Sequence, residues 1–407
     1  MSRHEGLSAW TLTVSNHMPH LSKPQVTVLA MWSYGIAITR SCGRTTVATF
    51  LALLLQQKAT TMEQRLREWG YDATDKRGIH RRELDVTTCF APLLIWIVSL
   101  WTTTSIALAL DATSLGDRFV ALTVSVVIRG CAIPVAWSIC QAQQKGSWRR
   151  VWLRLLRQLR PAIPADWVVL VLTDRGLYGR WLFRRIVRLG WHPFMRINRA
   201  AKFQPSGQPR WFWLSELVGQ VGATWYGRGI AFKSSSSGRL ACVLIAWWGE
   251  GHDEPWFILT DLPPEACQAS WYGLRAWCEQ GFKCTKRGGW QWQYTRMSDP
   301  TRAARLWLAL AIATLWVVSV GSDLEVGPSA EQTELPDLRS ILGIAAHRAR
   351  PRRTRTFRLG CLWLLVQHIT HHCLPMPQRL APEPWPELPA PSAFYLIPRQ
   401  ETSHVPI

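Results

Sequence analysis

The sequence is short of acidic residues and has no paired cysteine motif. Its 407 residues include 27 Asp and Glu against 47 Lys and Arg, a formal net charge of +20. Such a charge indicates a polyanionic partner, either nucleic acid or an anionic membrane surface. The ten cysteines form no C-x-x-C pair, and the cluster His371, His372 and Cys373 has no second ligand pair at zinc spacing. The sequence therefore does not predict a structural zinc site.

The N-terminal residues, MSRHEGLSAWTLTV, lack the apolar core of a signal peptide, so we expect reduced thiols and a cytoplasmic protein. Residues 86–110 are a run of 25 uncharged residues, which is long enough to span a bilayer. The run contains Pro92 and the polar residues 102–105, and then alternates like a strand. We interpret it as a buried helix, a turn and a buried strand; a membrane anchor is the alternative.

The first 88 residues have the pattern of short helices with tight turns. Thr60 and Glu63 fit a capping box at the start of one of them. Such a region is compatible with a helix-turn-helix-like DNA-binding unit, or equally with a helical cap on the next domain.

The rest of the chain predicts an α/β fold. Residues 105–141 contain three strand-like runs, followed by an amphipathic helix, a buried strand, a second helix and a further strand. Residues 201–265 are rich in Gly, Ser and Trp and indicate a β-rich insertion, whereas the Arg- and Pro-rich C-terminus is typical of a flexible tail. The predicted domains are 1–88, helical; 89–200, first part of the core; 201–265, insertion; 266–322, second part of the core; and 323–407, tail.

Two carboxylates stand at the ends of predicted strands. Asp111 ends the first strand and Asp174 ends the fourth, and sites in open α/β sheets form at strand ends. With Glu279 they offer hard oxygen ligands, which suit Mg²⁺ or Mn²⁺. Two such ions would suffice for phosphoryl transfer. A turn or cap role is the alternative for each Asp, and Asp261 is a rival third carboxylate.

One further segment carries four functional side chains at helical spacing. Tyr272, Arg275, Glu279 and Lys286 would fall within roughly 60° on a single helix. The Tyr, Arg and Lys side chains are then placed to hold DNA phosphates beside Glu279. An ordinary i,i+4 pair of Arg275 with Glu279 is the alternative.

This order of residues resembles the DDE transposases of bacterial insertion sequences. The spacing Y-x2-R-x3-E-x6-K is that of the insertion-sequence-four family, and LALDATSLGDRF and LTDRGLYG resemble its two Asp segments. The resemblance extends over about residues 85–320. It implies a ribonuclease H-like catalytic core with an inserted all-β subdomain, in which Asp111, Asp174 and Glu279 form the metal-binding triad.

The resemblance also implies the reaction and its partners. The family cuts double-stranded DNA at terminal inverted repeats and joins the ends to target DNA, with a homodimer holding both ends. Two Mg²⁺ or Mn²⁺ ions, DNA contacts by Tyr272, Arg275 and Lys286, and a flipped base held by aromatic side chains are part of this expectation. The candidates for the base are Trp247, Trp248 and Trp256. A nuclease that cuts without joining, and a DNA-binding protein without catalysis, are the alternatives.

Overall fold

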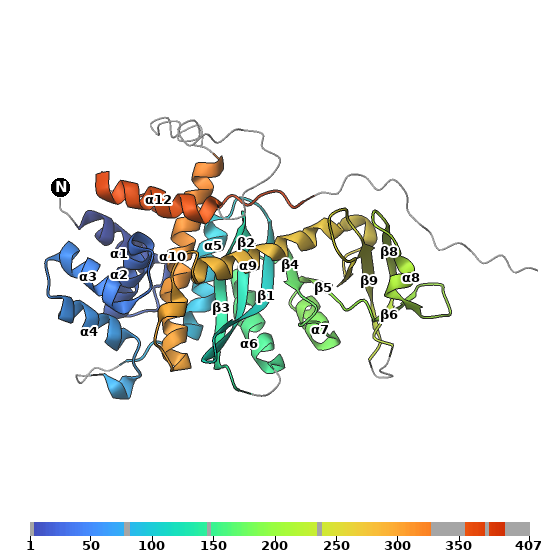
Figure 1. Cartoon of the computed structure of the whole chain (residues 1–407), viewed down its shortest axis with the longest axis horizontal. Coiled ribbons are helices and arrows are strands. Elements are labelled where there is room, and N and C mark those ends of the chain that lie inside the picture. Colours follow the sequence, from blue (N-terminus) through green and yellow to red (C-terminus); the bar gives the residue numbers. More distant parts are fainter. Residues whose placement is uncertain are drawn as a thin grey trace, which may run out of the picture. The chain divides into compact units, whose positions relative to one another are not determined.

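The computed structural model describes residues 4–76, 82–144, 148–233, 238–326, 355–370 and 374–386. These residues form two compact units, each containing both helices and strands (Figure 1). The first unit comprises residues 1–169 and 274–384, and the second comprises 170–273 and 385–407. The predicted mixed α/β class is therefore confirmed, whereas the ribonuclease H-like topology and the predicted domain limits stay predictions.

The first unit begins with four helices: α1 (Glu5–His17), α2 (Lys23–Thr39), α3 (Arg44–Leu55) and α4 (Ala59–Trp69). The sequence pattern indicates the three helices α2, α3 and α4, and α1 adds a fourth. The capping-box prediction is wrong, because the N-cap of α4 is Lys58 and has no side-chain cap. Glu63 instead bridges two helices, since its carboxylate lies 3.2 Å from Nε of Arg44. A 3-10 turn, η1 (Ala73–Asp75), follows α4.

The uncharged run 86–110 folds as interpreted from its sequence. It forms η2 (Val86–Cys89), α5 (Phe90–Leu100), a short turn, and the first part of strand β1 (Ser105–Leu115). Leu93 and Ile97 on α5 are fully buried. The run is therefore core structure of the first unit.

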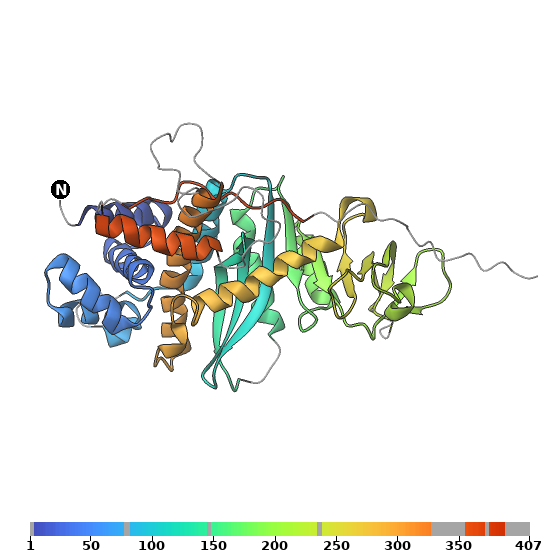
Figure 2. The ribbon, with the colours of Figure 1, turned by 45° about the horizontal axis from the view of Figure 1, so that its top comes forward.

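Strands β1, β2 (Phe119–Ile128) and β3 (Cys131–Gln141) form an antiparallel sheet in the order β3-β2-β1. The β1–β2 hairpin turns at Gly116, which has a φ of +57°. Two amphipathic helices pack on these strands: α6 (Arg149–Leu159) and α9 (Ala276–Thr285). Figure 2 shows α9 lying across the sheet. The crossing is close, because a Cβ added at Gly281 would lie 2.7 Å from Cβ of Ala132.

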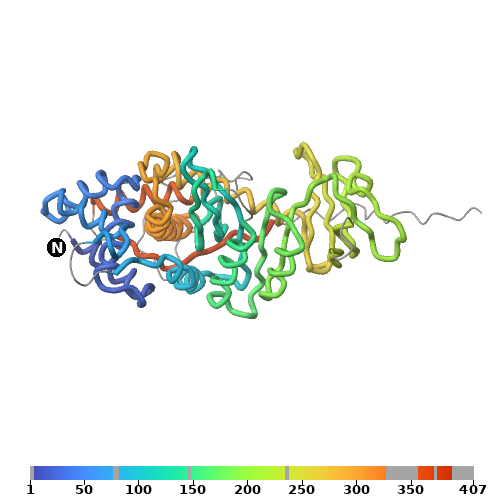
Figure 3. The backbone as a smooth tube through the Cα atoms, turned by 90° about the horizontal axis from the view of Figure 1, so that it is seen from below, coloured from blue at the N-terminus to red at the C-terminus, as the bar shows by residue number. Residues whose placement is uncertain are grey.

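The long helix α10 (Pro300–Val326) contacts both the sheet and α2 (Figure 3). It is the one described helix long and apolar enough to cross a membrane, and 94% of its most apolar window is buried within the protein. Burial by α2, β3 and α12 (Arg355–Thr370) accounts for this apolar composition without a membrane.

The prediction of a flexible tail is wrong for residues 355–370 and 374–386. Helix α12 crosses α10 so closely that a Cβ on Gly360 would lie 1.8 Å from the carbonyl oxygen of Val317. Two glycines, Gly321 and Gly360, thus allow the helix backbones to touch. The following segment pairs with the end of α5, where the Leu380 N–H donates to the carbonyl of Leu100 at 2.7 Å. The cluster 371–373 and the Arg-rich residues 347–354 lie outside the described residues.

The second unit is built on strands. Strand β4 (Val168–Thr173), through which the chain enters this unit, pairs in parallel with β5 (His192–Arg196), and α7 (Arg180–Arg188) connects them. The order continues β5-β10-β9-β8-β6-β7. The predicted insertion is thus β-rich but contains the short helix α8 (Leu214–Leu217), and its last strand β10 bonds directly to β5. The strands of the insertion are β6 (Lys202–Pro205), β7 (Phe212–Trp213), β8 (Thr224–Ala231), β9 (Leu240–Trp247) and β10 (Trp256–Thr260).

Candidate active site

The first unit brings Asp111 and Glu279 to the same guanidinium. The prediction that Asp111 ends its strand is wrong: Asp111 lies near the middle of β1, opposite Thr123 of β2, because the strand continues to Leu115. Glu279 lies on α9. Arg275 Nη2 is 2.8 Å from Asp111 Oδ2, and Arg275 Nη1 is 3.3 Å from Glu279 Oε1. The side chains of Asp111 and Arg275 are each 13% exposed, whereas that of Glu279 is 62% exposed. One guanidinium therefore pairs with two carboxylates at the point where α9 crosses the sheet.

The prediction that four signature residues share one helix is wrong. Tyr272 and Arg275 belong to a 3-10 helix, η5 (Ala269–Arg275), and α9 begins at Ala276. Lys286 follows the last residue of α9 and has ψ of −132°, outside the helical region. A change of helix type between positions 275 and 276 alters the angle per residue, so the 100° spacing does not apply across it.

Tyr272 packs in an aromatic cluster of the second unit. Its ring centroid is 5.1 Å from that of Trp256 and 5.9 Å from the guanidinium carbon of Arg196. The Tyr272 side chain is buried, with 5% exposure. Trp256 also contacts Trp247 at 5.0 Å. The DNA contact predicted for Tyr272 stays a prediction, because the contacts described for its ring are with Trp256 of the insertion and Arg196 of β5.

Lys286 reaches back to the end of β1. Its Nζ donates to Thr113 Oγ1 and to the carbonyl oxygen of Ser114, each at 2.7 Å. Burial lowers the pKa of the Lys286 ammonium from its ordinary value of 10.5. The side chain lines a cavity of 380 Å³ together with Lys283 and Arg287. The residues that line this cavity include no acid, so its charge favours an anion.

Asp174 and Asp261 both lie in the second unit. Asp174 follows β4 in a turn, where its Oδ1 accepts from the N–H of Gly176 at 2.9 Å. Asp261 follows β10, and its Oδ1 lies 3.1 Å from Nδ1 of His192. The contact of Asp174 with Gly176 is the turn role given as its alternative, whereas Asp261 contacts a histidine side chain. The metal-binding role of Asp174 stays a prediction.

The donor chemistry of the predicted triad fits a hard divalent cation. Within neither unit do three described His, Cys, Asp or Glu side chains stand together as a metal cluster. In the first unit the two carboxylates do converge, and Arg275 supplies the positive charge between them. Carboxylate oxygens that gather around a cation are the ligand type that Mg²⁺ and Mn²⁺ prefer.

Two neighbours of this site carry no signal in the sequence. Cys278 is buried beside Asp111; burial first, and the Asp111 carboxylate second, raise the pKa of its thiol. Glu383 comes from the C-terminal segment and accepts a hydrogen bond from Trp277 Nε1 at 2.8 Å. The same Glu383 side chain accepts from the backbone N–H of Arg129 at 2.6 Å. The tail thus ties the first turn of α9 to the β2–β3 turn.

Comparison with known proteins gives one family match. Residues 121–316 match the model of the transposase DDE domain. Residues 121–316 are therefore a transposase DDE domain, and the protein is a transposase. The match includes Asp174, Arg275, Glu279 and Lys286 and begins ten positions after Asp111. DDE transposases catalyse DNA transposition, so the transposase acts on DNA.

Among curated proteins, none matches the transposase. A solved structure similar to it is the cryo-EM structure of a piggyBac transposase synaptic complex with hairpin DNA. The two chains are 8% identical, the likeness covers 88% of this chain and 77% of the other, and the TM-score is 0.38.

Proposed function

We propose that the transposase cuts DNA at the terminal inverted repeats of an insertion sequence and joins the ends to target DNA. In this proposal Asp111, Asp174 and Glu279 are the carboxylates that hold one or two Mg²⁺ or Mn²⁺ ions. The observation that carries it is the meeting of Asp111 and Glu279 at Arg275, in a chain that matches the DDE domain. The group to which we assign the enzyme is the insertion-sequence-four family, on its Y-x2-R-x3-E-x6-K spacing.

The side chains of the first unit have distinct roles in this proposal. A bound metal ion would lower the pKa of the attacking water or 3′-hydroxyl and would stabilise the negative charge on the leaving oxygen. Arg275 orients the two carboxylates before DNA arrives, because its Nη2 bonds Asp111 and its Nη1 bonds Glu279. Lys286, Lys283 and Arg287 neutralise the phosphates that flank the cut.

Double-stranded DNA is the proposed partner, both as element end and as target. Helix α6 supports this partner, because Arg150, Arg154 and Arg157 are exposed on one face at i, i+4 and i+7. The helix contains no acidic residue that would neutralise them. We further propose a homodimer, since two ends must be cut together, and action in the cytoplasm, where the thiols stay reduced.

DNA carrying the flanks of the gene tests this proposal. Wild-type protein should cleave at the flanks in Mg²⁺ or Mn²⁺, while Asp111→Asn, Asp174→Asn and Glu279→Gln should bind the DNA without cleaving it. Cleavage without joining by the wild type would favour a nuclease, and binding without cleavage a repurposed DNA-binding protein. Cleavage that survives Glu279→Gln would move the third carboxylate to Asp261.

A further inference from the structure

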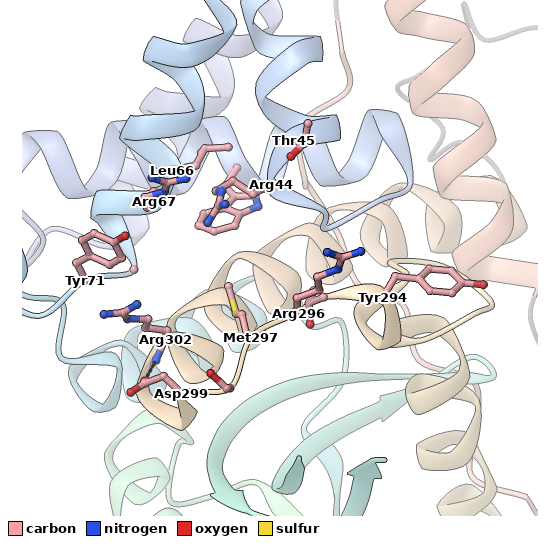
Figure 4. A pocket seen from close by; sticks show the side chains of 14 residues that line it. Arg44, Thr45, Leu66, Arg67, Tyr71, Tyr294, Arg296, Met297, Asp299 and Arg302 are labelled. Carbon is pink, nitrogen blue, oxygen red and sulfur yellow. Dashed lines mark hydrogen bonds between the residues drawn. The ribbon is translucent and has the colours of Figure 1, made fainter. Parts of the chain in front are cut away.

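A second basic cavity lies away from the candidate active site, between the N-terminal helices and the start of α10. It has a volume of 440 Å³, which is within the range of small-ligand sites. Figure 4 shows Arg44 and Arg67 on one side of it and Arg296 and Arg302 on the other. Two segments distant in the sequence thus build one site: residues 32–71 of the helical region, and residues 294–302, which run into the first turn of α10.

The charge of this cavity is only partly balanced. Arg44 and Arg67 share the carboxylate of Glu63, at 3.2 and 3.9 Å, and Arg302 lies 3.1 Å from Asp75. Arg296 is exposed, and no ion pair is found for it in the described part of the chain. Asp299 also lines the cavity, and its Oδ1 accepts from the backbone N–H of Arg302 at 2.8 Å. Four guanidinium groups therefore face three carboxylates, and the remaining positive charge favours a phosphate-bearing ligand.

The cavity also has aromatic and apolar walls. The guanidinium of Arg302 lies 4.4 Å from the ring centroid of Tyr71. Trp32 is 2% exposed, and Leu66 and Met297 complete the apolar lining. Tyr294 lines the cavity although its side chain is 71% exposed, so its ring is available for stacking. Arginine side chains beside one exposed aromatic ring, that of Tyr294, are a composition that binds unpaired nucleotides.

We propose that this cavity takes an unpaired nucleotide of a DNA strand, with its phosphate against Arg296 and its base against Tyr294. The site differs from the aromatic cluster around Trp256, which lies in the second unit. The proposal rests on the proposed function only in taking DNA as the source of the nucleotide. The proposal assigns to the helical N-terminal region a contact with a DNA strand.

Binding of the full-length protein to a fluorescent single-stranded oligonucleotide tests the site. Arg296→Gln and Tyr294→Ala should each weaken binding about tenfold, which corresponds to the loss of one phosphate or stacking contact. Both side chains are exposed, so the thermal unfolding midpoint should not change. The matched control is Arg65→Gln, because Arg65 is exposed on α4 but does not line the cavity.

Each other outcome contradicts the proposal. Equal losses for Arg65→Gln and Arg296→Gln would mean that net charge alone decides binding. Unchanged affinity in Arg296→Gln and Tyr294→Ala would mean that the strand does not enter the cavity. If dTMP competes at concentrations close to those of the oligonucleotide, the ligand is a free nucleotide. Asp111→Asn should bind the oligonucleotide normally, so loss of cleavage and loss of this site are separate results.

Discussion

Arg275 Nη2 lies 2.8 Å from Asp111 Oδ2, and both side chains are almost completely buried. The pair joins β1 to the start of α9, which lie more than 160 residues apart in the sequence. Arg275 also contacts Glu279, and the two contacts together fix the orientation of the guanidinium plane. Arg275 therefore links two elements of the first unit and contacts both candidate carboxylates of that unit.

Arg275→Gln should lower both stability and activity. The Asp111 carboxylate would lose its charged partner in a largely dry position, so we expect the free energy of unfolding to fall by about 1–3 kcal/mol. Urea unfolding measures this, and Mg²⁺-dependent cleavage measures activity. Arg275→Lys is the matched control: it keeps the charge but cannot bridge both carboxylates, so an intermediate result is expected. Equal stability of all three proteins would show that the ion pair is not structural.

Lys286 gives a pH dependence to DNA binding. Because burial lowers its pKa below 10.5, Lys286 loses its charge at a lower pH than an exposed lysine does. Binding should therefore weaken as the pH rises from neutral toward 10, and Lys286→Arg should remove this alkaline loss. Lys286 keeps its proton to a higher pH in the unfolded chain than in the folded protein. Its contribution to the free energy of unfolding therefore becomes more favourable with rising pH. An identical alkaline profile in Lys286→Arg would assign the loss to other groups.

The close crossing of α9 and β3 depends on Gly281. A Cβ there would lie 2.7 Å from Cβ and 3.0 Å from the carbonyl oxygen of Ala132. Gly281→Ala should therefore lower the free energy of unfolding by about 1–3 kcal/mol, although alanine is the better helix former. Gly219→Ala, where a Cβ meets nothing within 4 Å, should change it by less than about 1 kcal/mol. Denaturant titration of both variants decides whether the crossing is tightly packed.

Local patterns predicted most elements of the chain correctly. The buried run before Asp111, the β1–β3 strands and the helices α6, α7 and α10 follow from periods of two and of 3.6 residues. The capping box failed because Glu63 is held by Arg44, a contact between helices that no local pattern contains. The prediction that the four signature residues share one α-helix failed because the chain forms the 3-10 helix η5 before Ala276.

The tail shows what composition alone misses. Its Pro and Arg content is typical of disorder, yet Phe357, Cys361 and Leu364 on α12 are buried. That burial needs α10 as a partner, and the partner is far away in the sequence. Glu383 likewise lies in a Pro-rich stretch. Its carboxylate accepts hydrogen bonds from Trp277 and Arg129, which are both distant from it in the sequence.

Removing the Glu383 carboxylate should loosen the start of α9. Glu383→Ala leaves the indole N–H of Trp277 and the backbone N–H of Arg129 without their acceptor. The free energy of unfolding should therefore fall by about 1–3 kcal/mol. Trp277→Phe removes only one donor and should cost less. Cleavage should decline with Glu383→Ala, because Arg275 and Glu279 flank Trp277 on the same segment. Unchanged stability and cleavage would show that the tail does not position the site.

The arginine face of α6 makes a prediction about salt. Each phosphate contact adds about 0.9 to the slope of log affinity against log salt on B-DNA. Replacing Arg150, Arg154 and Arg157 together by Gln should therefore reduce the slope for duplex DNA by up to about 2.7. The three side chains are exposed, so the unfolding midpoint should stay the same. Replacing all three by Lys is the control, because it keeps the charges and should restore the slope. A slope unchanged in the Gln variant would mean that this face of α6 does not contact DNA.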